Sequence, residues 1–165
     1  MNNTQYIVKQ TLALDLDIAL IEGAEINNPR LDYEKWRDDP MVVIARRGHP
    51  LLGRKNISCN HLGLYSWILR EKGSGTAALI EHHAFGKFDL DVEMVLSDFE
   101  AIKNYVANSD CLSCVSSASI SQLERARLQI VPVPRFSFSR PLCFVTNKDK
   151  YQSAASLEFK ETIRM

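Results

Sequence analysis

Short apolar runs alternate along this chain with segments in which apolar residues recur at every third or fourth position. Continuous apolar runs are typical of buried strands, and the longer period is typical of amphipathic helices. Alternation of the two kinds of segment predicts an α/β fold. The sequence shows neither an internal repeat nor a flexible linker that would divide it into independent modules.

The predicted helices begin where a polar residue precedes an amphipathic segment. The first follows the Asn2-Asn3-Thr4 cap and carries on one face Ile7, Val8, Thr11 and Leu12. The others are expected at residues 77–84, behind a capping box formed by Ser97 and Glu100, at residues 117–127 and after Ser153. We expect the closing helix to place Leu157 and Ile163 on its inner face.

The predicted strands are residues 17–22, 41–45, 67–69, 91–96, 111–115, 129–133 and 141–146. Residues 17–22 are almost continuously apolar, as is typical of strands in a buried parallel sheet. Alternation along residues 91–96 gives one face to Val92, Met94 and Leu96. We expect the polar stretch of residues 24–39 to be irregular apart from an edge strand near Trp36.

Length and charge narrow the classes of function. The chain has 165 residues, which suit one domain or two small lobes with a hydrophobic core. Its 20 basic and 20 acidic side chains cancel, so it lacks the basic surface typical of nucleic-acid binding. No apolar run approaches the about 18 residues of a membrane span, and no signal peptide is recognisable. We therefore expect a cytoplasmic protein that does not bind membranes.

The cysteines are Cys59, Cys111, Cys114 and Cys143. Without a secretory signal they are expected to be reduced thiols. Cys111 and Cys114 have the spacing of a thioredoxin-like redox pair, but their strand-like surroundings favour buried core thiols. No metal-ligand spacing relates them to the histidines, which are His49, His61, His82 and His83. We expect neither a metal ion nor a cofactor.

Two loops combine features that suit ligand binding. Gly73-Ser74-Gly75-Thr76 and Ser97-Asp98 each follow a predicted strand and open a predicted helix. In open α/β sheets, ligands bind at the carboxyl ends of strands, against helix starts whose unpaired amides suit small anions. The glycines would let the backbone approach a ligand, and the hydroxyls would donate hydrogen bonds. The same residue types are also ordinary helix caps, so each loop alone is a weak signal.

No arrangement of residues indicates catalysis. The glycine-rich loop lacks the Lys-Ser/Thr ending of a phosphate-binding P-loop. Ser74 lacks the Gly-x-Ser-x-Gly frame of a serine hydrolase, and the neighbouring Glu71 and Lys72 are expected on a solvated surface. We therefore expect a binding protein rather than an enzyme.

Taken in order, these segments resemble the effector-binding (substrate-binding) domain of LysR-type transcriptional regulators. The resemblance rests on residues 16–23, 42–45, 48–51, 67–76, Ser97, 100–103, Val106, Phe144 and Phe159. Its most specific part is residues 67–76, which are similar to the family's Trp-x-x-Arg-Glu-x-Gly-Ser-Gly-Thr loop. This loop and residues 100–103 look most like the branch that includes regulators of sulfur metabolism.

The resemblance implies a periplasmic-binding-protein-like type 2 fold, with two α/β lobes joined by crossover strands near residues 41–45 and 141–146. Lobe I would comprise residues 1–40 and 147–165, and lobe II residues 41–146. A small anionic effector would bind in the cleft between the lobes and shift the arrangement of dimers or tetramers on DNA. The implied effector-binding residues are Gly73, Ser74, Gly75, Thr76, Ser97, Asp98, Thr4, Ala45 and Arg46.

The sequence departs from the family pattern in two places. It shows no counterpart of the winged helix-turn-helix, the linker helix, or the first strand and helix of lobe I. We therefore expect lobe I to be incomplete and DNA to be bound only through a domain outside this chain. Where the family has Val-x-x-Gly-Leu-Gly-Ile, the chain has residues 106–112 without glycine, so Asn108 or Asp110 is expected to take any left-handed position.

Other functions compatible with this fold remain open. A solute-binding lobe of a transporter is disfavoured by the missing signal peptide. An enzyme is disfavoured because no nucleophile has a base beside it. A non-functional fragment of a regulator is a further alternative, and such a fragment should aggregate or unfold without cooperativity.

Overall fold

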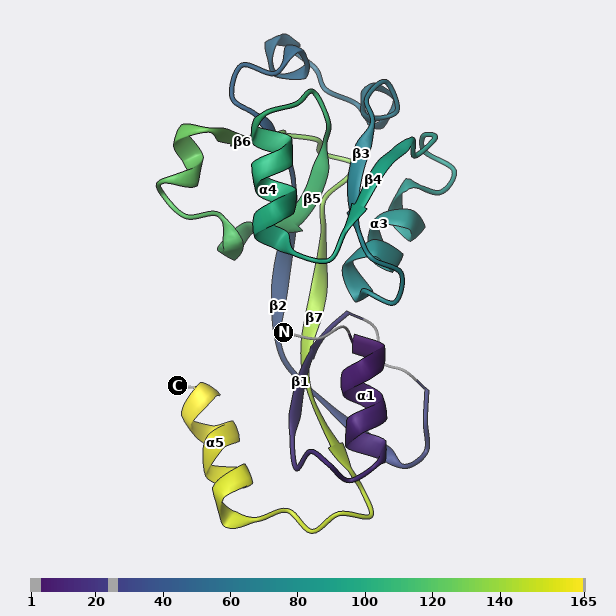
Figure 1. The fold of residues 1–165 in the computed structure, drawn as a ribbon, viewed down its shortest axis with the longest axis vertical. Helices are drawn as coiled ribbons and strands as arrows, with labels where there is room; N and C mark the ends of the chain where they lie inside the picture. The colour runs from purple at the N-terminus through teal and green to yellow at the C-terminus, as the bar shows by residue number, and fades with distance from the viewer. Residues whose placement is uncertain (1–3, 24–26, 165) are drawn as a thin grey trace. The chain divides into compact units, whose positions relative to one another are not determined.

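The computed structural model describes residues 4–23 and 27–164, which form a mixed α/β structure (Figure 1). The helices are α1 (Thr4–Leu12), α2 (Cys59–Leu62), α3 (Gly75–Ala84), α4 (Phe99–Ala107) and α5 (Ala154–Arg164), with 3-10 helices η1 (Pro50–Gly53), η2 (Ser117–Ser119) and η3 (Glu124–Ala126). The strands are β1 (Ala19–Glu22), β2 (Leu31–Arg46), β3 (Trp67–Arg70), β4 (Val92–Leu96), β5 (Ser113–Ser116), β6 (Leu128–Ile130) and β7 (Phe138–Asn147).

The chain divides into two compact units. Unit 1 contains the described residues up to Asp38 and those from Arg140 onward, and unit 2 contains Asp39–Ser139. Strands β2 and β7 each begin in one unit and end in the other. They include the segments predicted as crossover strands, whereas the predicted lobe boundaries fell after residues 40 and 146.

Unit 2 has a sheet that is covered on both faces. Trp67 and Leu69 of β3 pack with Ile80 of α3, whereas Ile68, between them, packs with Ile102 of α4. Since neighbouring side chains of a strand point to opposite faces, α3 and α4 cover opposite faces of β3 (Figure 1). This arrangement explains why β3 and β5 are buried at every position.

In unit 2, β3 has a neighbouring strand segment on each side. β4 pairs with β3 in parallel. On the other side, Ile68 N donates to Leu112 O (2.8 Å) and Leu112 N donates to Ser66 O (2.9 Å), so the segment leading into β5 also runs parallel to β3. β2 pairs antiparallel with both β5 and β6.

β4 is an edge strand. Among the residues predicted to share one face, Leu96 packs with the α4 cluster, whereas Val92 and Met94 are exposed. Val95, on the opposite face, is exposed too. The predicted alternation therefore does not give β4 a buried face.

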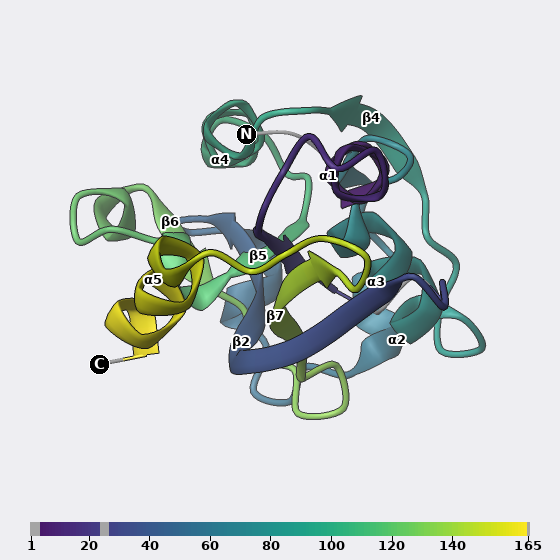
Figure 2. The ribbon, with the colours of Figure 1, turned by 90° about the horizontal axis from the view of Figure 1, so that it is seen from below.

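Unit 1 is built on β1, β7 and β2, which are neighbours in that order. Val8 of α1 packs with Ile21 and Val145 on one face of these strands. On β7, Phe144 follows Cys143 and points to the opposite face, where the Lys160 ammonium of α5 lies 6.0 Å from its ring centre. The helices α1 and α5 therefore lie on opposite faces (Figure 2).

The strand predicted at residues 17–22 forms as the shorter β1, but the parallel pairing expected for it is wrong. β1 pairs antiparallel with β7, and Leu20 is half exposed between the buried Ala19 and Ile21. A continuous apolar run does not distinguish a strand buried on both faces from a strand that carries one exposed leucine.

The strand predicted near Trp36 forms as part of β2, but β2 already begins at Leu31, so the irregular structure predicted for the rest of residues 24–39 is wrong from Leu31 onward. Residues 24–26 lie outside the described part of the chain. Backbone pairing does not require apolar side chains, so the polar residues of β2 are accommodated on its exposed positions. Pro40, which lacks an amide hydrogen, precedes Met41, where the pairing of β2 with β5 begins.

The α-helix predicted at residues 117–127 is wrong, because this segment forms the 3-10 helices η2 and η3. Ser116 Oγ accepts a hydrogen bond from Ala118 N (3.2 Å), and Glu124 Oε2 accepts one from Ser121 N (2.7 Å). Side chains thus bind amides that would otherwise donate to backbone carbonyls, which favours turns over a continuous helix.

The closing helix α5 forms as predicted, and Ser153 Oγ accepts a hydrogen bond from Ser156 N (3.2 Å) at its start. The inner face predicted for it is wrong in part. Leu157 is 49% exposed, whereas Ser156 is buried and Ile163 is partly buried. The helix therefore buries Ser156 in place of the neighbouring Leu157.

The turn after α4 avoids left-handed backbone. Among the described non-glycine residues only Leu14 has a positive φ, and Asn108 has φ −120°. The left-handed position predicted at Asn108 or Asp110 is therefore wrong. Asn108 N donates to Tyr105 O and its Nδ2 donates to Asn104 O (2.7 Å), so the asparagine closes the turn without glycine.

Candidate ligand-binding site

Two helices of unit 2 begin at the same edge of its parallel strands. β3 and β4 are in register from Ile68↔Met94 to Arg70↔Leu96, so both strands end together. α3 begins shortly after β3 and α4 shortly after β4. The structure therefore brings the predicted loops 73–76 and 97–98 to one edge of the sheet, where two helix starts each contribute about half a positive charge.

The start of α3 has an unusual polar group. Ser74, a largely buried residue, is the N-cap residue, yet its hydroxyl makes no capping hydrogen bond and has no hydrogen-bond partner in the described part of the chain. Gly73 has φ 91°, a left-handed conformation that favours glycine. Gly75 and the buried Thr76 form the first turn, which contains no acidic side chain. This helix start can therefore offer its amides and the Ser74 hydroxyl to an anion.

The start of α4 is capped differently from the prediction. Asp98 is the N-cap residue, and its Oδ2 accepts a hydrogen bond from Ala101 N (2.8 Å). The predicted capping box of Ser97 and Glu100 is wrong, because Glu100 instead pairs with Lys103 (2.6 Å). Asp98 occupies the cap position, which leaves Ser97 outside the helix and exposed.

Arg70 connects the two helix starts. Its Nε and Nη2 donate to both carboxylate oxygens of Glu71 (2.8 and 3.0 Å), and its guanidinium carbon lies 4.4 Å from the centre of the Phe99 ring. The hydrogen bond from Arg70 lowers the pKa of Glu71. Glu71 was expected on a solvated loop surface, but this ion pair neutralises its charge beside the candidate site.

A pair that the sequence did not indicate lies at the same edge. Ser116 ends β5, whose approach is parallel to β3, and its Oγ donates to Asp39 Oδ1 (2.5 Å). Both side chains are buried. The two residues are 77 positions apart, so spacing could not relate them. The one available signal was the position of Ser116 directly after an apolar run, which it shares with Ser97.

The structure does not bring Ala45 and Arg46 to these helix starts. β2 runs antiparallel to β5, so residues beyond Ile44 lie toward the beginning of β5, at the opposite edge. Ala45 is fully buried in the core. Arg46 Nε pairs with Asp110 Oδ1 (2.8 Å), which follows the end of α4.

Thr4, another residue implied by the resemblance, belongs to unit 1. Its Oγ1 donates to the backbone oxygen of Glu22 (3.2 Å), which joins α1 to the end of β1. Its participation in effector binding stays a prediction.

The cysteines and histidines form no reactive or metal-binding site in the described residues. All four cysteines are free and buried. Burial first, and then the hydrogen bond from Cys111 Sγ to Glu93 Oε2 (3.0 Å), raise the pKa of Cys111 to about 11, opposite to the shift that a redox-active thiol requires. Within residues 4–23 and 27–164, no cluster of three or more His, Cys, Asp or Glu side chains has metal-binding geometry. No described helix has the length and hydrophobicity to span a membrane.

Comparison with known proteins decides the family. The sequence model described as "LysR substrate binding domain" matches residues 1–165. The chain belongs to the LysR family. The HTH-type transcriptional regulator CysL of Bacillus subtilis is 32% identical over 147 residues, which are 88% of this chain and 49% of that protein. YeiE of Escherichia coli K12, an uncharacterized HTH-type transcriptional regulator, is 32% identical over 96% of this chain and 54% of its own length.

Solved structures give the same assignment. The Synechocystis PCC6803 CcmR regulatory domain in complex with 2-PG is 29% identical and has a TM-score of 0.86, with 99% of this chain and 79% of that chain covered. This LysR substrate-binding domain therefore has the predicted periplasmic-binding-protein-like type 2 fold. It spans about half the length of the curated relatives described above.

Proposed function

We propose that unit 2 of this LysR substrate-binding domain binds a small anionic effector at the neighbouring starts of α3 and α4. The observation that carries the proposal is the parallel register of β3 and β4, which sets both helix starts on one edge. The CcmR regulatory domain, 29% identical, binds a small molecule, 2-PG, in its solved structure. Binding of a small molecule by a related chain supports the same role here.

The start of α3 supplies most of the attraction for an anion. Its first turn has no acidic side chain, and the Ser74 hydroxyl has no hydrogen-bond partner among the described residues. At α4, by contrast, Asp98 already occupies one amide and adds a negative charge. We therefore assign the charged group of the effector to Gly73–Thr76, and assign to Ser97 and Asp98 contacts with hydroxyl or amine groups of the effector.

The domain acts by binding, without catalysis. The relatives that match this chain are named as transcriptional regulators. A regulator of this kind works in the cytoplasm and meets DNA through a domain outside this chain. The effector can change the arrangement on DNA only if it binds the alternative arrangements with different affinities.

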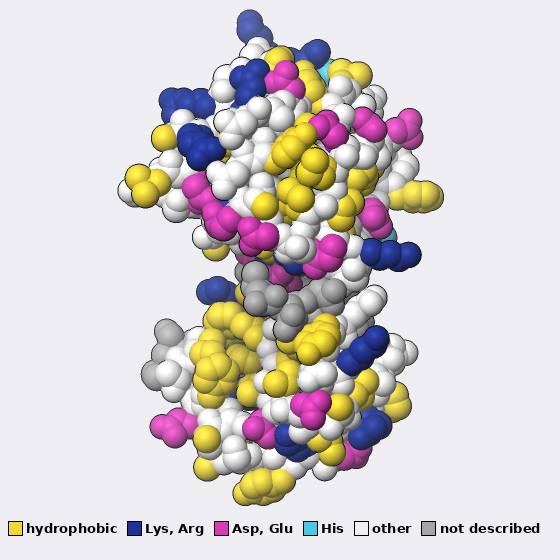
Figure 3. Space-filling view, in the orientation of Figure 1, with side chains coloured by type: hydrophobic (Ala, Val, Ile, Leu, Met, Phe, Trp, Pro, Cys, Tyr) yellow, Lys and Arg dark blue, Asp and Glu magenta, His cyan; other side chains and the backbone are white. Residues whose placement is uncertain are grey.

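We further propose that the chain self-associates through β4. This edge strand exposes Val92, Met94 and Val95, and Figure 3 shows hydrophobic side chains gathered on the face of unit 2 that carries α4 and β4. An unpaired strand edge with apolar side chains is a template for pairing with another strand. Light scattering of Val95→Asp should give a monomer where the unchanged chain is a dimer. Leu123→Asp, at an exposed site on another segment, should stay dimeric. A dimeric Val95→Asp chain would refute the proposed contact.

Effector binding is tested by thermal unfolding of the whole chain with sulfate, thiosulfate, phosphate, amino acids and small carboxylates. A ligand at about 100 times its Kd adds about 2.7 kcal/mol to the free energy of unfolding, so the Tm should rise. Ser74→Ala should reduce this rise, whereas Ser58→Ala, which alters the cap of α2, should keep it.

Two results would count against the proposal. One is a cooperatively unfolding sample whose Tm no compound raises. The other is an equal rise in the Ser74→Ala and Ser58→Ala chains, because general salt effects stabilise any compact protein. Unfolding without cooperativity would favour the non-functional fragment instead.

A further inference from the structure

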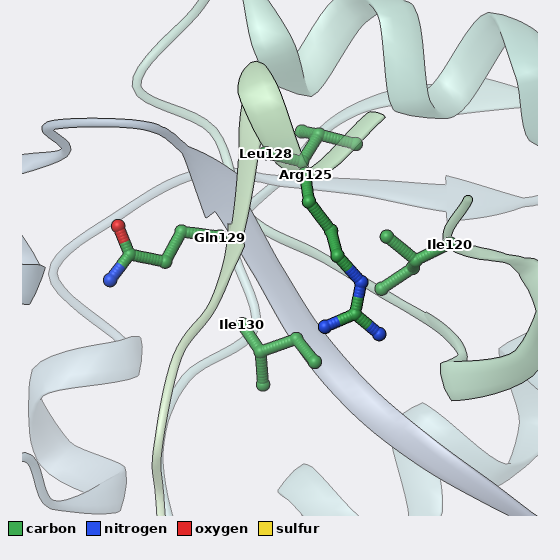
Figure 4. Close-up of a pocket in the computed structure, with 5 residues that line it drawn as sticks. All are labelled: Ile120, Arg125, Leu128, Gln129 and Ile130. Carbon is green, nitrogen blue, oxygen red and sulfur yellow. The ribbon is translucent and has the colours of Figure 1, made fainter. Parts of the chain in front are cut away.

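A pocket of unit 2 lies away from the helix starts, beside β6. It has a volume of about 260 Å³ and is lined by Ile120, Arg125, Leu128, Gln129 and Ile130. Ile120 and Leu128 are buried and form an apolar floor, and Ile130 is partly exposed. In Figure 4 the Arg125 guanidinium lies between Ile120 and Ile130, whereas the Gln129 side chain points to the other side of β6. The pocket thus presents aliphatic carbon with one cation at its mouth.

The charge around this pocket is positive. Arg47 Nη1 donates to the backbone oxygen of Arg125 (3.4 Å), and Arg127 Nη2 donates to Asn104 Oδ1 (3.3 Å), so both bind neutral acceptors. Within the described part of the chain, none of Arg47, Arg125 and Arg127 forms an ion pair with a carboxylate. Figure 3 shows Lys and Arg side chains gathered over the part of unit 2 where Figure 1 draws β6. An anion that binds Arg125 would therefore not have to displace a carboxylate already paired with one of these three arginines.

The walls of the pocket are fixed by a buried lysine. Lys103 Nζ donates to the backbone oxygen of Ser119 (2.9 Å) and pairs with Glu124 (2.5 Å) and Glu100 (2.6 Å). These bonds fasten the segment that carries Ile120 and Arg125 to α4. The Lys103 ammonium also offsets one of the two negative charges of Glu100 and Glu124. A pocket whose walls are held in place loses less entropy on binding.

We propose that this pocket is a binding site for a short aliphatic carboxylate, separate from the effector site. The hydrocarbon chain of the ligand would cover Ile120, Leu128 and Ile130, and its carboxylate would accept hydrogen bonds from the Arg125 guanidinium. The volume suits a molecule of roughly eight non-hydrogen atoms rather than a drug-sized ligand. A branched acid such as 4-methylpentanoate has this size and shape.

The proposal is tested by methyl NMR of the whole chain, labelled at isoleucine and leucine methyl groups and titrated with 4-methylpentanoate. Saturable shifts are expected at Ile120, Leu128 and Ile130. The neutral amide of the same acid should bind roughly tenfold more weakly, because it lacks the charge that Arg125 recognises. Arg125→Gln should weaken binding of the acid by a similar factor. Arg54→Gln, which changes an exposed arginine next to η1, should leave it unchanged.

Three results would overturn the site. They are the absence of saturable shifts at these methyl groups, equal affinity for acid and amide, and unchanged affinity in Arg125→Gln. Ile130→Thr, which keeps a β-branched residue in β6, should also weaken binding, and its spectrum reports whether the chain stays folded. Because the readout is local, loss of anion binding at α3 would not affect this result.

Discussion

The Arg70 guanidinium lies over the ring of Phe99, with 4.4 Å between its carbon and the ring centre, and so joins the last residue of β3 to the first residue of α4. The same guanidinium binds Glu71 through two hydrogen bonds. One buried side chain thus binds a residue just before the first loop of the candidate effector site and a residue just after the second.

Replacement of Arg70 should therefore lower the stability of the folded chain. Arg70→Lys keeps the charge but loses the paired hydrogen bonds and the flat surface over Phe99, and should lower the free energy of unfolding by about 1–3 kcal/mol. Urea unfolding measures the change. Arg54→Lys, at an exposed position, is the control and should change it by less than about 0.5 kcal/mol. Equal effects of the two substitutions would show that Arg70 has no such structural role.

The cap of α4 gives a second contrast. Asp98→Ala removes the side chain that accepts from Ala101 N and should cost about 1 kcal/mol of stability. Ser97→Ala removes a hydroxyl that the helix does not use, so its effect on stability should be close to zero. A larger loss in Ser97→Ala than in Asp98→Ala would restore the capping box that the sequence predicts.

Acid should weaken the attachment of residues 117–127 to α4. Burial alone would raise the pKa of Glu124, but hydrogen bonds from Lys103 and the Ser121 amide hold it at about 2, below its ordinary value of 4.5. A carboxyl whose pKa is lower in the folded state stabilises fully above its unfolded pKa, and this stabilisation is lost as the pH falls from about 4.5 toward 2.

The loss is measured by urea unfolding at a series of pH values. Glu124→Gln should flatten the pH dependence over this range by an amount on the order of 2 kcal/mol. Glu158→Gln, in α5, should leave the pH dependence unchanged. A curve for Glu124→Gln that parallels the unchanged chain would contradict the assignment.

The buried thiols should be unreactive in the folded chain. With a pKa of about 11, Cys111 is about 0.1% thiolate at pH 8. Native protein should therefore react slowly with a thiol reagent such as 5,5′-dithiobis(2-nitrobenzoate), and all four cysteines should react once urea unfolds it. Fast reaction of Cys111, or a Cys111–Cys114 disulfide in mass spectra after mild oxidation, would instead support the thioredoxin-like redox pair.

The sequence predicts the strands and helices that surround the candidate site because each has a strong local signal. The run at residues 67–76 combines an apolar strand with glycines and hydroxyls, and its helix and neighbouring strand appear where predicted. The predictions fail where a local pattern is shared by two structures. The mostly polar residues 31–38 are compatible with a loop or with an exposed strand. Residues 117–127 have helical spacing, but serine side chains there, and Ser116 just before them, form hydrogen bonds with nearby backbone amides and favour turns.

The details of the site depend on contacts that no local pattern contains. Asp98 rather than Ser97 caps α4 because the helix begins at Phe99, one residue later than the predicted capping box requires. Ser116 and Asp39 meet only through the pairing of β2 with β5. Arg46 lies at the opposite edge because β2 runs antiparallel to β5, and no local sequence pattern indicates the relative direction of these two strands.

Amide chemical shifts of the whole chain, titrated with the anion that raises the Tm most, test effector binding most directly. The largest saturable changes should fall on Gly75 and Thr76 at the start of α3, with smaller ones at Ser97, and Ser74→Ala should weaken them. Saturable changes centred anywhere else in unit 2, or none at these amides, would contradict an anion site at the start of α3.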